Sequence, residues 1–295
     1  MKFVVGAAVV LFAAGWQSRA NATETISVEE FRTRLKTTLD EATTSWIDAD
    51  RHAFCARYPS ERCESPEFAR EYKRVRLLFE ATRDGGFFRL RWAITNHEPS
   101  CRDILHAWEV ESPISQPSAT AECDELSALF AYLARLVDVK NAGLWWPRWN
   151  HVVGLWRPEA FGTNTPIVVV PTSQIFLTCR EGWDTRGLGT PKKMAPYSQR
   201  DLSKPLSITI ANRLLQSIQT YAPLRPDLLN AVRLHRAERY VSSIGSCQTA
   251  RKQMLPRAED LSAPEVAALM AYGNEIGEMD LSKILTRLAE PSPKL

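Results

Sequence analysis

The middle of the chain differs in residue pattern from both ends, and this contrast limits the fold to a mixed class. Short β-branched and aromatic runs, bounded by proline, glycine and asparagine, occupy 150–156 (NHVVGLW), 166–171 (PIVVVP) and 174–178 (QIFLT). Such runs are typical of strands. Amphipathic helical periods flank them on both sides. The pattern predicts an α+β protein, in which a small antiparallel sheet packs on a helix that begins at Cys123, with helical N- and C-terminal segments.

The flanking helices carry their own start signals. Ser27 with Glu30, and Ser262 with Glu265, have the spacing of a capping box before an apolar period. One helix is predicted over 27–49, another over 67–86 with its end at the glycine pair, and another from Leu206 onward. After the glycine pair, apolar residues alternate with polar ones at Phe88, Leu90, Trp92 and Ile94. This alternation favours a strand, and a helix is the alternative.

The N-terminus predicts export. Residues 1–22 combine Lys2, an apolar run over 3–14 and Ala20-Asn21-Ala22 as a cleavage signal. This is the pattern of a secretory signal peptide, with an uncleaved anchor as the alternative. We therefore expect a periplasmic or extracellular protein that has no stable membrane insertion after cleavage. Cleavage leaves 35 of the 37 basic residues against 34 acidic ones, a balance that gives no indication of nucleic-acid binding.

Six cysteines in an exported chain make disulfides reasonable. They are Cys55, Cys63, Cys101, Cys123, Cys179 and Cys247. Cys55 and Cys63 flank a Tyr-Pro-Ser turn and are the first expected pair. The other four can form two further bridges, so Cys123 is either a nucleophile or half of a disulfide. Cysteine and histidine spacings do not fit metal or haem patterns, so no metal and no cofactor is expected.

Composition shifts suggest four segments. Loops rich in proline, serine or charge at 112–119 and around 195–205 are the candidate boundaries. The predicted segments are a signal peptide (1–22), a helical N-terminal segment (23–112), a core (113–200) and a helical C-terminal segment (201–295). The helices over 27–49 and 206–222 can nevertheless pack together.

The Cys123 helix has the features of a reactive-thiol site. Leucine and other apolar residues recur every three or four positions over 126–137, which predicts a helix with its N-terminus near Cys123. Backbone N–H groups and the helix dipole stabilise a thiolate there, whereas Glu122, Asp124 and Glu125 oppose it. We expect a modestly lowered pKa of the Cys123 thiol. His151 heads the following strand and can complete a thiolate–imidazolium pair.

Over residues 121–178 the sequence resembles the transglutaminase-like superfamily of cysteine hydrolases. The resemblance consists of AECDELSALFAYLARL with its cysteine, WNHVVGLW with its histidine, and VVVPTSQ with Pro171-Thr172. It implies a transglutaminase-like or papain-like core in which Cys123 and His151 are catalytic. The family places an aspartate directly before the Pro-Thr pair to orient the histidine, and here that residue is Val170.

The loss of that aspartate leaves the third catalytic position open. Val170, Thr172 and Gln174 share one face of a regular strand, so Thr172 or Gln174 can approach the histidine. The alternative is that this strand is plain core. Trp146 and Trp149 are candidates for lining a substrate groove, although aromatic side chains beside strands also build cores.

These residues predict a cysteine hydrolase or acyltransferase that acts on a peptide or amide bond of a peptide or protein substrate, for which the cell envelope is a candidate source. The alternative is a catalytically silent module of the same fold that binds a peptide or peptidoglycan in the envelope.

Overall fold

The computed structural model describes residues 24–92, 120–148, 151–158, 167–172, 206–238 and 255–290. Several predicted features lie outside these residues: the signal peptide, the loops at 112–119 and 195–205, the strand at 174–178, Trp149, Gln174, Cys101, Cys179 and Cys247. The described helices are α1 (Val28–Glu41), α2 (Ile47–Arg57), α3 (Pro66–Thr82), α5 (Cys123–Leu136), α6 (Ile208–Tyr221), α7 (Pro226–Glu238), α9 (Ala263–Ile276) and α10 (Leu281–Ala289), with short 3₁₀ helices η1 (Glu61–Glu64) and η6 (Ala258–Asp260).

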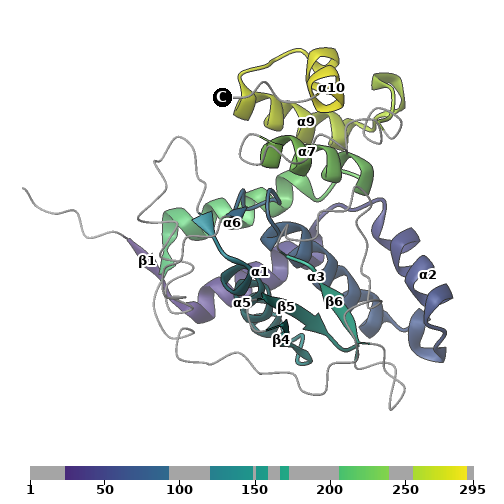
Figure 1. The fold of residues 1–295 in the computed structure, drawn as a ribbon, viewed down its shortest axis with the longest axis vertical. Coiled ribbons are helices and arrows are strands. Elements are labelled where there is room, and N and C mark those ends of the chain that lie inside the picture. The colour runs from purple at the N-terminus through teal and green to yellow at the C-terminus, as the bar shows by residue number, and fades with distance from the viewer. Residues whose placement is uncertain are drawn as a thin grey trace, which may run out of the picture.

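A three-stranded antiparallel sheet lies beside α5, in the part of the fold below α6 in the view of Figure 1. Its order is β4 (Ala142–Arg148), β5 (His151–Trp156) and β6 (Val168–Val170). α5 packs on this sheet, and a Cβ atom at Gly154 would lie 3.0 Å from the Phe130 ring of α5. Glycine on β5 therefore lets the helix approach closely. The prediction of an α+β protein with a small antiparallel sheet is confirmed.

Alternation along β5 assigns its side chains to two faces. Val152 and Trp156 belong to the large core that contains α5. Val153 and Leu155 form a second, small cluster with Val169 on the other face. β5 is consequently buried on both sides, which explains why its sequence is almost uniformly apolar.

The helix predicted over 27–49 is interrupted. α1 ends at Glu41, because Ala42 leaves the helical conformation with ψ of 130°, and α2 begins only at Ile47. The break turns Trp46 into the core, where its Nε1–H donates to the Ala222 carbonyl oxygen at 3.1 Å. A continuous period of apolar residues could not show this break, because the residues on both sides of it are buried.

Within the described residues, the alternating pattern after the glycine pair forms a strand only at Arg91–Trp92, and Ile94 lies outside them. Residues 83–88 make bends and turns, and β2 (Arg91–Trp92) pairs in parallel with β3 (Thr120–Ala121). Gly85 has φ of +68°, and its N–H donates to the Leu90 carbonyl oxygen at 2.8 Å. The chain thus folds back on itself here. β4 is not among the strands predicted from the sequence, because the glycine and proline within it weaken the strand pattern.

The two ends of the chain share one core. β1 (Thr25–Ile26) pairs antiparallel with β7 (Leu206–Ser207), and α1 packs against α6 as anticipated. Figure 1 shows α6 running between the sheet-containing part and the helices α7, α9 and α10. Buried apolar residues from Ile26 to Leu288 belong to one continuous cluster. No helix in the described part of the chain is long and apolar enough to cross a membrane.

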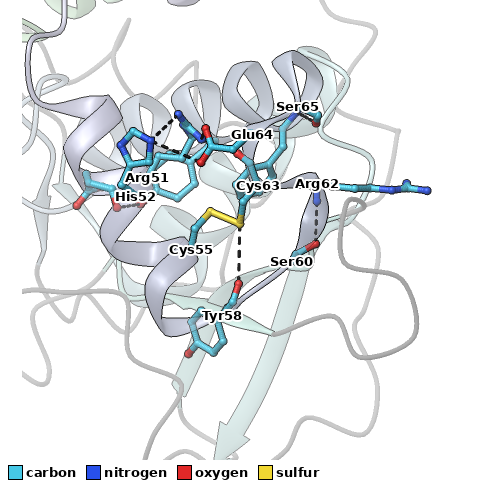
Figure 2. Close-up of a disulfide and its surroundings, with 12 residues drawn as sticks. Arg51, His52, Cys55, Tyr58, Ser60, Arg62, Cys63, Glu64 and Ser65 are labelled. Atoms are coloured by element: carbon cyan, nitrogen blue, oxygen red, sulfur yellow. Dashed lines mark hydrogen bonds and ion pairs between the residues drawn. A yellow bond between two sulfur atoms is a disulfide. The ribbon is translucent and has the colours of Figure 1, made fainter.

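A disulfide joins α2 to η1 (Figure 2). Cys55 and Cys63 are bonded, with their Cα atoms 6.0 Å apart, which confirms the predicted pair. Arg51 is buried beside this bridge, and its guanidinium donates to the carbonyl oxygen of Cys63 and lies 3.4 Å from Glu64. The disulfide therefore closes a short turn, and Arg51 of α2 also holds this turn by its hydrogen bond to Cys63.

Replacing both Cys55 and Cys63 with serine should lower the free energy of unfolding by about 2–3 kcal/mol, since the bridge restricts the unfolded chain even across a short loop. Urea unfolding of the two proteins measures the difference. Ser60→Ala in the same turn is the control, because it removes only the hydroxyl that accepts from the Arg62 N–H at 3.3 Å. A double variant no less stable than that control would contradict the prediction.

Candidate active site at the start of α5

A capping box fixes the start of α5. The Glu122 N–H donates to Glu125 Oε2 at 2.8 Å, and the Glu122 side chain accepts from the N–H of the third helical residue. Cys123 is therefore the first residue of the helix, as the sequence predicts. Its side chain lies at the end of α5 where free N–H groups and the positive end of the helix dipole are found.

Cys123 carries a free thiol that is buried, with 8 % of the residue exposed. Burial raises the pKa of this thiol above its ordinary value, and the nearby Asp124 carboxylate adds to the increase. Backbone hydrogen bonds from Val152, Asp124 and Cys123 itself act in the opposite direction and do not cancel it. The expectation of a lowered pKa is wrong, because desolvation outweighs the favourable field of the helix. At neutral pH the group is a thiol.

His151 begins β5 directly before Val152, whose backbone hydrogen bond reaches the Cys123 sulfur. The histidine is buried, and burial lowers the pKa of its imidazole. It is therefore neutral at pH 7. By alternation the ring belongs to the face of Val153, whereas the sulfur meets the strand at the backbone of Val152. The backbone next to His151 is thus adjacent to the Cys123 sulfur, and at pH 7 the two side chains are a thiol and a neutral imidazole rather than an ion pair.

Ser127 lies one helical turn after Cys123 and connects α5 to β5 and to the residues that follow β6. Its Oγ lies 2.6 Å from the Cys123 carbonyl oxygen, 3.2 Å from the Val152 carbonyl oxygen and 2.9 Å from Thr172 Oγ1. Because Ser127 has one proton for two carbonyl groups, the Thr172 hydroxyl is the natural donor to it. Ser127 was not predicted as a site residue. Its signal in the sequence is a serine on the apolar face of the helix, four residues after the cysteine.

The candidates for the third catalytic position have different surroundings. Thr172 is buried, its hydroxyl contacts Ser127, and its carbonyl oxygen accepts from the Asp84 N–H at 2.9 Å. Val170 is fully buried in the main core. Gln174 lies outside the described residues. The contacts of Thr172 hold the end of β6 against the start of α5.

The tryptophans near the site differ in exposure: some lie at the surface and one lies in the core. Trp146 on β4 is 49 % exposed, and Trp145 packs partly against the small cluster of Val153. Trp156 is fully buried, and its Nε1–H donates to Glu71 at 2.8 Å, so it is a core residue. Trp146 is therefore the described tryptophan that can meet a substrate.

Among the described residues, no group of three or more His, Cys, Asp or Glu side chains could hold a metal ion. Comparison with known proteins found no matching family model, no matching curated protein and no matching solved structure.

Proposed function

We propose that the chain is an exported cysteine hydrolase or acyltransferase of the transglutaminase-like type, with Cys123 as nucleophile and His151 as general base. The observation that carries this proposal is the position of a free thiol at the first residue of α5, bonded to the amide of Val152 directly after His151. A cysteine at a helix start beside a strand-borne histidine is the arrangement that nucleophilic thiol catalysis needs.

The directions in which burial shifts the pKa values of Cys123 and His151 determine the protonation states from which the reaction starts. Because thiol and imidazole are both neutral at rest, His151 takes the thiol proton while the sulfur attacks the carbonyl carbon of a peptide or amide. The backbone N–H of Cys123 stabilises the oxyanion. The imidazolium then returns the proton to the leaving amine, and a thioester remains on Cys123. Water, deprotonated by His151, attacks the thioester and releases the acid and the thiol.

A silent binding module in the cell envelope is the second candidate function. The raised pKa of Cys123 favours it, as does the buried Val170 in place of the family's aspartate. In this case Trp146 holds a peptide or peptidoglycan by its exposed ring, and the thiol takes no part.

Acylation by p-nitrophenyl acetate distinguishes the two candidates. A nucleophilic Cys123 attacks the ester carbonyl, p-nitrophenolate leaves, and an acetyl thioester forms. We expect a burst of p-nitrophenolate with wild type, an acetylated peptide that contains Cys123 by mass spectrometry, and no burst with Cys123→Ala. A wild-type protein that retains its fold by circular dichroism but gives no acetylated Cys123 would support the binding module instead.

A further inference from the structure

The Ser127 hydroxyl makes more contacts than a helical serine needs. A serine inside a helix commonly donates to the carbonyl oxygen four residues before it, and Ser127 Oγ lies 2.6 Å from the Cys123 carbonyl oxygen. This bond would by itself satisfy the hydroxyl proton. Ser127 Oγ also lies 3.2 Å from the Val152 carbonyl oxygen and 2.9 Å from Thr172 Oγ1. Ser127 and Thr172 are both almost fully buried, so these contacts are shielded from water.

The backbone ladder between β5 and β6 stops before it reaches Val152. Gly154 faces Val170 in this ladder, and the same register would place Thr172 opposite Val152, but the pairing ends at Gly154 and Val170. The Thr172 N–H donates to the Val170 carbonyl oxygen at 3.0 Å, and its own carbonyl oxygen accepts from the turn after α3 at 2.9 Å. Both backbone groups of Thr172 are therefore used elsewhere, and its hydroxyl reaches β5 through Ser127.

The start of α5 supplies partners for the Val152 backbone. The N–H and the C=O of one residue in a strand point to the same side. The Val152 N–H bonds the Cys123 sulfur, and the Val152 carbonyl oxygen lies beside Ser127 Oγ. Cys123 and Ser127 are four residues apart, which places them on one face of α5. Ser127 thus holds the same residue whose amide meets the sulfur.

The position of Val152 affects the atom on which negative charge forms in the proposed reaction. A hydrogen bond from an N–H to a thiolate is charge-assisted, and it is stronger than a bond to a neutral thiol. Burial has the largest effect on the pKa of Cys123 and raises it, whereas the bond from Val152 lowers it. Hydrogen bonds weaken steeply when their geometry is lost, so a shifted strand would weaken this one. His151 shares a peptide unit with the Val152 N–H, so the same hydroxyl also restrains the backbone of the general base.

We propose that Ser127 is a positioning residue for the thiol, and that Thr172 orients its hydroxyl. Thr172 donates to Ser127 Oγ. Ser127 shares its proton between the carbonyl oxygens of Cys123 and Val152, as three-centre bonds at helix ends do. The Val152 N–H is thereby held on the sulfur. The part of both hydroxyls in catalysis rests on the proposed function, whereas their hold on the sulfur can be measured without any catalysis.

Alkylation by iodoacetamide tests the proposal, when it is followed against pH by mass spectrometry of the peptide that contains Cys123. Ser127→Ala should move the midpoint to higher pH and slow alkylation at pH 7 about three- to tenfold, since the thiolate loses part of a charge-assisted hydrogen bond. A serine that only fills space would give the opposite sign, because its removal would admit water and hydration favours the thiolate. The direction of the shift therefore separates positioning from packing.

Thr172→Val removes the second hydroxyl and should shift the midpoint in the same direction as Ser127→Ala. Thr172→Ser retains the hydroxyl and should restore the wild-type profile. Thr82→Val is the matched control. Thr82 is fully buried on α3, and its hydroxyl donates to the Leu78 carbonyl oxygen four residues before it at 2.8 Å. This variant also loses a buried hydroxyl, but it should leave the profile of Cys123 unchanged.

An unchanged or lowered midpoint in Ser127→Ala or in Thr172→Val, measured on protein whose circular dichroism matches wild type, would overturn the proposal. An equal shift in Thr82→Val would overturn it too, because it would show a general effect of losing a buried hydroxyl. Failure of the proposed function has a separate signature: p-nitrophenyl acetate does not acetylate the wild-type protein, although the midpoint still rises in Ser127→Ala.

Discussion

Replacing His151 with alanine should slow the acylation of Cys123 by p-nitrophenyl acetate about 10²- to 10⁴-fold, the usual contribution of a general base. The large effect follows from the pKa of Cys123, which burial raises, so that very little thiolate is present at neutral pH. Without His151 no neighbouring group of the proposed mechanism removes the proton during attack. Stopped-flow measurement of p-nitrophenolate release gives the rate constants.

The directions of the pKa shifts of Cys123 and His151 determine how the rate of acylation changes with pH. Burial lowers the pKa of His151, so the imidazole stays neutral to a pH below the ordinary value of about 6.5. Burial raises the pKa of Cys123, so the thiol persists above its ordinary value. Acylation should therefore be constant through neutral pH, fall when His151 becomes protonated at acidic pH, and increase again only when thiolate forms in alkaline solution.

Alkylation by iodoacetamide separates a neutral pair from an ion pair. A resting thiolate–imidazolium pair would keep alkylation fast below pH 7 and would lose this reactivity in His151→Ala. A neutral pair instead gives slow alkylation at pH 7, and the alkylation rate rises about tenfold for each pH unit. The midpoint of this pH profile should be the same in His151→Ala. His52→Ala, which removes a surface histidine, is the control and should change neither reaction.

Replacing Glu80 with alanine should lower the free energy of unfolding by about 3–5 kcal/mol, because it removes a buried carboxylate that pairs with two buried arginines, of which Arg76 keeps its contact with Asp50. Glu80 on α3 contacts Arg76 at 3.2 Å and Arg83 at 2.9 Å, and all three side chains are almost fully buried. Burial lowers the pKa of Arg83 to about 10, so this guanidinium is still charged at pH 7. Chemical denaturation followed by circular dichroism measures the loss.

Glu29→Ala is the matched control for Glu80. Glu29 also pairs with an arginine one turn away, Arg32 at 3.5 Å, but it is well exposed to solvent. Exposed pairs contribute little, so its loss should change the free energy of unfolding by less than about 1 kcal/mol. Similar losses in the two variants would show that burial of Glu80 adds nothing.

Much of the central site can be predicted from local sequence. The acidic residues around Cys123 indicate a helix start, and the capping box forms there. The β-branched run after His151 indicates β5, which begins at that residue. The pKa of Cys123 was predicted in the wrong direction, because sequence reveals the charges beside the thiol but not the exclusion of water from it.

The sequence by itself determined the elements with strong local signals: α5, α9 with its capping box, β5, and the Cys55–Cys63 bridge across a short turn. These depend on contacts between residues near in the chain, which a pattern of residue types records directly.

Only the tertiary structure decided what joins these elements. The contact of Ser127 with Val152 and Thr172 spans 25 and 45 residues, and the carboxylate of Glu275 meets Arg89 from the far end of the chain. The break at Ala42 and the turn after α3 likewise depend on distant partners. Burial and charge pairing at such distances arise from packing, and burial sets the protonation of Cys123 and His151.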